Sequence, residues 1–181
     1  MTTEASDARE LTEEEQRVRA YLVGQAEKRD WIELWPRMIA ERGALLQLVD
    51  GLSDEQADWS PGGDEWSTRQ IVEHVLAVSR GTLQLIEDLA AGRPEDEREP
   101  RSPAKPPSSF VRLRAHLVEH SVKLASLPER LPGMVNLEMT SPHSNFGELN
   151  SRAWFLFNRI HDTDHREQIE AIQAAGGYPT T

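Results

Sequence analysis

The chain has 181 residues, no cysteine and a formal net charge of -11, with 31 acidic residues against 20 Lys and Arg. This length predicts one domain with a single core. The lack of cysteine excludes disulfides, zinc–thiolate sites and a protein thiol as nucleophile, and the acidic balance disfavours nucleic acid and anionic bilayers as partners.

Helical periodicity dominates the chain, and no alternating strand pattern is present. Thr12 and Glu15 have the spacing of a capping box, which predicts a helix from residue 13 to the high twenties. This helix is charged and has little apolar content, so we expect it to be peripheral. A second helix begins near Trp31, contains Pro36 close to its start and ends at Asp50.

The stretch SDEQADWSPGGDEW reads as a turn-rich connection, and Ser67 with Gln70 then opens a helix that ends around Ala91. Residues 92–109 hold five prolines and many charges, which predicts a long surface connection. We expect a further helix over residues 110–126, an irregular segment over 127–149 and a final helix over 150–175.

These elements predict an all-α protein, a four-helix bundle with an additional N-terminal helix and two long connections. Residues 1–35 form an N-terminal extension with a charged helix, and residues 36–181 form the bundle domain. No apolar run reaches the length of a membrane span, and the N-terminus lacks the features of a secretory signal, so we expect a cytoplasmic protein. Bundles of this kind commonly dimerise, which makes a homodimer a further expectation.

The pair His161 and His165 is the most informative feature of the last helix. Four residues advance a helix by about 40° net, so both imidazoles project from one face and can bind one metal ion. His74 falls in an apolar row of another helix, with Ile71 and Val78, and is the candidate third ligand. A shared divalent ion would satisfy all three buried imidazoles at once.

The other histidines are weaker candidates. His120 lies in line with apolar positions of its helix whereas His116 falls at the edge, so we expect one buried, hydrogen-bonded histidine and one that faces solvent. His143 lies in the loop SPHSNFG, where it would line a site entrance or hydrogen-bond a turn. The acidic neighbours of the ligands are Glu73, Asp162 and Asp164. They point about 100° away on their helices, so we interpret them as solvated or supporting groups and not as general bases.

The sequence resembles the DinB/YfiT-like superfamily of metal-binding four-helix bundles. The resemblance rests on EWSTRQIVEHV and on SPHSNFGELNSRAWFLFNRIHDTDHREQIEAI, and it runs from about residue 36 to Pro179. It implies that His74, His161 and His165 are a three-histidine metal site and that Gln168 occupies the usual glutamine position of the family. Asp164 and Glu148 depart from the pattern, at positions where members often carry a basic residue and a proline.

A site of three neutral imidazoles leaves positions open for water or substrate. Related members resemble thiol-dependent transferases, so our first hypothesis is activation of a low-molecular-weight thiol for transfer or isomerisation. A metal-dependent hydrolase is the second hypothesis. A non-enzymatic metal-binding or stress-related bundle is the third, and it predicts a saturated ion with His120 or His143 as fourth ligand. Zinc and nickel lead the candidate metals, followed by iron, cobalt and manganese.

Overall fold

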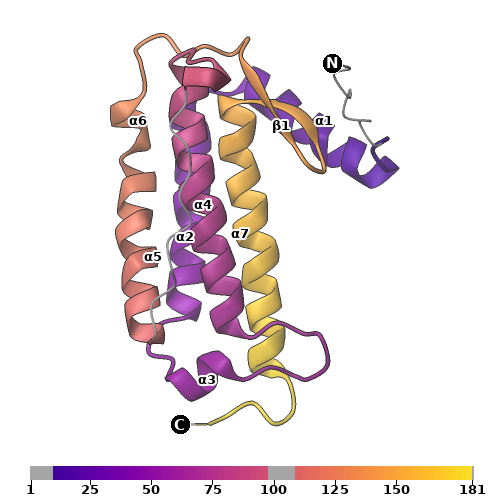
Figure 1. The fold of residues 1–181 in the computed structure, drawn as a ribbon, viewed down its shortest axis with the longest axis vertical. Coiled ribbons are helices and arrows are strands. Elements are labelled where there is room, and N and C mark those ends of the chain that lie inside the picture. The colour runs from indigo at the N-terminus through magenta and orange to yellow at the C-terminus, as the bar shows by residue number, and fades with distance from the viewer. Residues whose placement is uncertain (1–9, 98–108, 181) are drawn as a thin grey trace, which may run out of the picture.

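The protein forms the predicted all-α bundle in a computed structural model that describes residues 10–97 and 109–180. Figure 1 shows the helices of the bundle side by side, with the N-terminal helix and a hairpin beside one end. The bundle helices are α2 (Trp31–Leu48), α4 (Thr68–Ala90), α5 (Phe110–Ala125) and α7 (Ser151–Ala174). Most of the first long connection, residues 98–108 of the predicted 92–109, lies outside the described residues.

Local capping sets the helix starts that the sequence predicted. At α4, the backbone N–H of Ser67 donates to Gln70 Oε1 at 2.8 Å, and the N–H of Gln70 donates back to Ser67 Oγ at 3.3 Å. The same reciprocal pair at Thr12 and Glu15 opens α1 (Glu13–Lys28). This confirms both capping boxes, each of which pairs two backbone donors that a helix start leaves free.

Two connections hold more structure than expected. The turn-rich segment contains α3 (Asp54–Asp58), which has its own capping box from Ser53 and Gln56. Residues 127–149 contain α6 (Leu127–Arg130) and the start of an antiparallel hairpin of β1 (Thr140–His143) and β2 (Gly147–Asn150). The prediction of no strand was therefore wrong, because each strand spans four residues and is too short to show an alternating pattern.

The helix α1 lies against α7 and β2, at the edge of the bundle as predicted. Its contact is nevertheless apolar, because Leu22 and Ala26 are fully buried. The division into an extension over residues 1–35 and a bundle over 36–181 stays a prediction. Within the described ranges, no helix combines the length and apolar character that a membrane crossing requires.

The core has two apolar clusters along the bundle axis, separated by a polar layer. One cluster includes Met38, Leu83 and Leu124, and the other includes Leu45, Val75 and Leu117. Between these positions stand buried polar residues that include Arg42 on α2, Ser79 on α4 and Ser121 on α5, and Asp162 of α7 contacts Arg42 in the same layer. The layer lies at the level of the histidines on α7.

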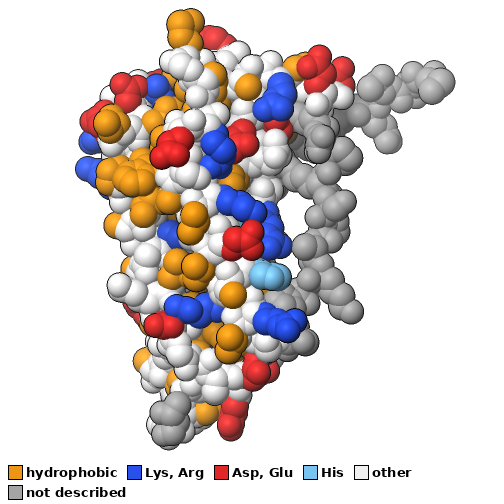
Figure 2. All heavy atoms as spheres, turned by 90° about the vertical axis from the view of Figure 1, so that its left-hand side faces the viewer, with side chains coloured by type: hydrophobic (Ala, Val, Ile, Leu, Met, Phe, Trp, Pro, Cys, Tyr) orange, Lys and Arg blue, Asp and Glu red, His pale blue; other side chains and the backbone are white. Residues whose placement is uncertain are grey.

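Figure 2 shows the side of the molecule formed by α5, where apolar side chains are spread between charged ones. Val111 and Val122 of α5 are 72% and 63% exposed. Such side chains are common singly on protein surfaces. The expected homodimer stays a prediction, and a monomeric mass in light scattering would contradict it.

Candidate metal centre

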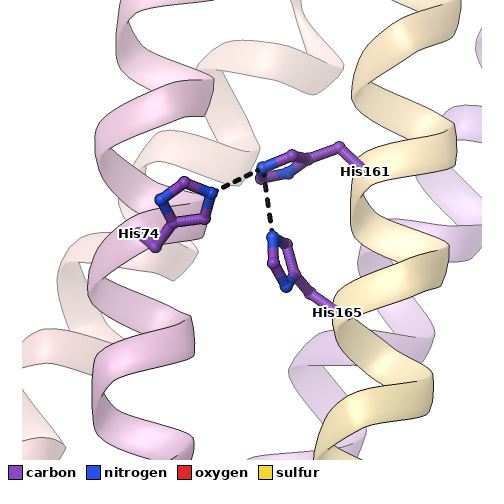
Figure 3. Close-up of side chains that lie close together, drawn as sticks. All are labelled: His74, His161 and His165. Atoms are coloured by element: carbon purple, nitrogen blue, oxygen red, sulfur yellow. Dashed lines mark hydrogen bonds between the residues drawn. The ribbon is translucent and has the colours of Figure 1, made fainter. Parts of the chain in front are cut away.

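The three predicted ligands come together between two helices. Figure 3 shows His74 reaching from α4 toward His161 and His165 on α7. The Nε2 atom of His161 lies 3.0 Å from that of His74 and 3.2 Å from that of His165. One nitrogen from each ring lies within 4.8 Å of the others. Tetrahedral zinc with bonds of about 2.0–2.1 Å would place its nitrogen ligands about 3.4 Å apart, so the cluster has the size of a metal site.

Burial favours the neutral form that metal ligation needs for His74 and His161. Burial, with smaller contributions from His165 and His74, lowers the pKa of His161 to about 3. Burial, followed by the charge of His165, also lowers the pKa of His74. Since the Nε2 atoms face one another and a neutral ring donates through one nitrogen only, they cannot all be paired among themselves. A cation between them would satisfy every lone pair, so the donor set fits a divalent metal ion.

Gln168 sets the orientation of one ligand. Its Oε1 lies 3.0 Å from Nδ1 of His165, one turn earlier on α7. An amide oxygen only accepts, so Nδ1 carries the proton and Nε2 keeps its lone pair toward the other two histidines. Metal-ligating histidines commonly have such a partner on the second nitrogen. The glutamine that the resemblance pointed to therefore has a physical role beside the cluster.

We expect Gln168→Ala to weaken metal binding by about 10–100-fold, because His165 loses the acceptor that fixes its tautomer and ring orientation. Gln168→Glu keeps an acceptor at the same position and should retain most of the affinity. Competition with a chromophoric chelator measures both variants against the unchanged protein. Equal affinity of Gln168→Ala and the unchanged protein would contradict this role.

Trp66 lies against the histidine cluster. The centroid of its ring is 5.3 Å from that of His74 and 6.4 Å from that of His165, and the ring is nearly parallel to the His165 imidazole. Beside it is a pocket of about 530 Å³. The lining residues come from the connection before α4 and from α4 and α7: Pro61, Asp64, Glu65, Trp66, Ile71, His165, Gln168, Ala171 and Ile172. A candidate ligand cluster thus borders a space large enough for a small molecule.

A buried ion pair behind the site was missed by the sequence analysis. Arg42 contacts both carboxylate oxygens of Asp162, at 2.6 and 3.0 Å, and both side chains are almost fully buried. Arg42 also donates to Ser79 Oγ at 3.0 Å and to Ser121 Oγ at 3.4 Å. Burial raises the pKa of Asp162, and the facing guanidinium opposes that rise. Asp162 is therefore not solvated, so the expectation of a solvated group is wrong for this residue. Both of its carboxylate oxygens are hydrogen-bonded to the Arg42 guanidinium.

The remaining histidines lie apart from the cluster. His116 is exposed, whereas His120 is buried with Nε2 3.1 Å from Ser79 Oγ, and both expectations are confirmed. His143 lies in β1, accepts a hydrogen bond from the N–H of Asn145 at 3.1 Å and stacks on Phe146. Within the described residues, the metal-sized cluster contains the three predicted ligands and neither His120 nor His143.

His120 should make stability sensitive to acid. Burial, ahead of the nearby Arg42 charge, lowers its pKa from 6.5 to about 4. Above pH 6.5 both the folded and unfolded forms are neutral, and as pH falls only the unfolded chain gains the proton. The free energy of unfolding should therefore drop by about 3 kcal/mol between pH 6.5 and pH 4 through this group.

His120→Gln should make the fall in stability over this pH range shallower, because glutamine keeps a hydrogen-bonding group beside Ser79 and does not titrate. Urea unfolding of the metal-free protein at several pH values measures the slope. His116→Gln is the matched control on the same helix and should leave the slope unchanged. Identical slopes for His120→Gln and the control would contradict the prediction.

Comparison with known proteins agrees with the fold. YuaE of Bacillus subtilis (strain 168), described as an uncharacterized protein, is 25% identical over 142 residues, which cover 69% of this chain and 88% of YuaE. The crystal structure of TT2238, described as a four-helix bundle protein, has a TM-score of 0.60 at 23% identity and covers 81% of this chain and 100% of TT2238. That likeness bears on the fold alone. The sequence profile of the DinB superfamily matches residues 37–169, and the chain belongs to this superfamily.

Proposed function

We propose that His74, His161 and His165 bind one divalent transition metal ion, and that this site activates a low-molecular-weight thiol for transfer to an electrophile or for isomerisation. The observation that carries the proposal is the convergence of three Nε2 atoms beside a pocket. Membership of the DinB superfamily and the histidine cluster are both compatible with metal binding. Zinc and nickel are the ions that we expect first.

The residues around the proposed metal site would have different roles. His74, His161 and His165 supply neutral ligands, Gln168 holds His165 in the ligating tautomer, and Trp66 covers the side of the cluster that borders the pocket. A divalent ion held by these ligands would keep its full charge and would lower the pKa of a thiol or water toward neutral pH. In the transfer reaction the thiol would lose its proton to solvent and its sulfur would bond to the electrophilic carbon, while the leaving group would depart with the electron pair of its bond to that carbon.

Hydrolysis is the second candidate function, and it depends on a carboxylate near the site that can accept a proton. A hydrolase needs a group that takes the proton of the attacking water. Asp162 is committed to Arg42, whereas Asp64 and Glu65 line the pocket and either could accept a proton. A bound thiol and a bound water must each lose one proton, so proton transfer does not separate the two reactions. The thiol reaction comes first because the sequence resembles a family with members that resemble thiol-dependent transferases.

The test offers mycothiol, bacillithiol and glutathione with model electrophiles to zinc- and nickel-loaded protein, and esters, amides and lactones without thiol in parallel. Support would be thiol consumption that requires metal, is lost in His161→Ala and is kept in His116→Ala. Absence of metal-dependent turnover with all three thiols would contradict the first assignment. Turnover of an ester or lactone without thiol would move the assignment to a hydrolase.

A further inference from the structure

The pocket beside His165 is bordered by two acidic side chains. Asp64 and Glu65 are its charged lining residues, and its lining within the described chain includes no Lys or Arg. Both residues are exposed, and neither forms an ion pair with a residue that the structure describes. Within the described part of the chain, no ion pair neutralises these two carboxylates, so they can attract a cationic ligand.

The nearest arginine in the sequence does not neutralise this rim. Arg69, on the first turn of α4, pairs with Asp54 at 2.6 Å and with Asp58, both on α3. Its side chain is mostly buried in that contact. Arg69 is therefore paired with carboxylates of α3 and does not pair with Asp64 or Glu65.

The rest of the pocket is apolar and aromatic. Pro61, Ile71, Ala171 and Ile172 give it hydrocarbon walls, and Trp66 contributes its indole. The face of a tryptophan ring attracts a cation through its quadrupole, and this attraction adds to that of nearby carboxylates. The volume of about 530 Å³ lies within the usual range for small-molecule pockets.

We propose that the pocket takes a small organic cation: a molecule with an apolar or aromatic body and an ammonium group that is held by Asp64, Glu65 and Trp66. This inference adds a substrate class to the proposed function. It rests on that function for the reacting end of the ligand, because His165 lines the same pocket and belongs to the histidine cluster. The ammonium group lies at the acidic rim, and the reacting group of the substrate lies toward the histidines.

The same charges discriminate among thiols. Glutathione and bacillithiol carry carboxylates, which the rim repels, whereas mycothiol carries none. An uncharged thiol or an aminothiol therefore suits this pocket better than an anionic one. If the thiol reaction holds, uncharged and cationic thiols should have the lower KM values.

A set of three probes of one shape tests the inference without turnover. Phenethylamine, 2-phenylethanol and 3-phenylpropionate are titrated into metal-free protein, so that no carboxylate can bind a metal ion, with calorimetry or tryptophan fluorescence as the readout. Two exposed carboxylates and an indole face should make the amine bind at least about tenfold more tightly than the acid, with the alcohol between them.

Asp64→Asn/Glu65→Gln should reduce the ratio of amine to acid affinity to about twofold or less, because the neutral side chains keep the shape of the rim. Glu129→Gln/Glu138→Gln removes the same net charge from exposed positions away from the pocket and should keep the full ratio. Trp66→Leu should weaken all three probes.

The experiments distinguish a failure of the cation-binding inference from a failure of the proposed metal-dependent function. No binding of any probe, equal binding of amine and acid, or a preference that survives in Asp64→Asn/Glu65→Gln would overturn the cation inference. A protein that selects the amine and yet takes up no zinc or nickel would keep the inference for the pocket and reject the metal-dependent function.

Discussion

Arg42→Met should lower the free energy of unfolding by about 3–5 kcal/mol, because it leaves the carboxylate of Asp162 buried without its partner. Both side chains are at most 2% exposed, so water cannot replace the guanidinium. The polar layer would then hold an uncompensated charge between two apolar clusters. Urea unfolding of the metal-free protein at pH 7 measures the loss.

Removal of both charges should restore most of the stability. In Arg42→Met/Asp162→Leu no buried charge remains, and the two serines keep other partners. Ser121 Oγ donates to the carbonyl of Leu117 at 2.6 Å, and Ser79 Oγ remains paired with His120. The double variant should lie within about 1 kcal/mol of the unchanged protein or above it.

The exposed pair of Lys123 and Glu119 on α5 provides the control. Both side chains are more than half exposed, so Lys123→Met should leave the unfolding midpoint unchanged. If Arg42→Met lowers the free energy of unfolding no more than this control does, the buried pair does not have the predicted effect on stability. Equal losses in Arg42→Met and in the double variant would show that packing, and not the unpaired carboxylate, sets the effect.

The bundle was predictable because its signals are local. Capping residues such as Ser67 and Gln70 act within one turn, and the bounds of the long helices follow from them and from the apolar rows. The pairing of His161 with His165 is equally local, since one helix fixes it. His74 needed only the apolar row of its own helix and the resemblance to identify it as the third member of the cluster.

The missed features depend on contacts between distant segments. Arg42 and Asp162 are 120 positions apart, and a charged residue is by default assigned to the surface. A signal was present, because Arg42 falls in the buried register between Met38 and Leu45. Trp66 gave no comparable signal, since its place over the histidines depends on the path of the connection before α4.

His161→Ala should abolish stable metal binding, because His161 is the member of the cluster that lies close to both other ligands. The remaining pair, His74 and His165, would have to hold an ion from two helices with no third nitrogen. The affinity should fall by more than the roughly 10–100-fold expected when a supporting residue such as Gln168 is lost. Plasma mass spectrometry of protein purified without chelator or a nickel column measures the metal content, and zinc titration measures the affinity.

His116→Ala is the matched control for the loss of an imidazole. His116 is exposed on α5 and lies outside the cluster, so this variant should keep about one metal ion per chain, as the unchanged protein does. His74→Ala should behave as His161→Ala does, because the site needs ligands from both α4 and α7. If the unchanged protein is metal-free and takes up neither zinc nor nickel, the three histidines are polar groups of the bundle interior, and the chemistry proposed for them loses its physical basis.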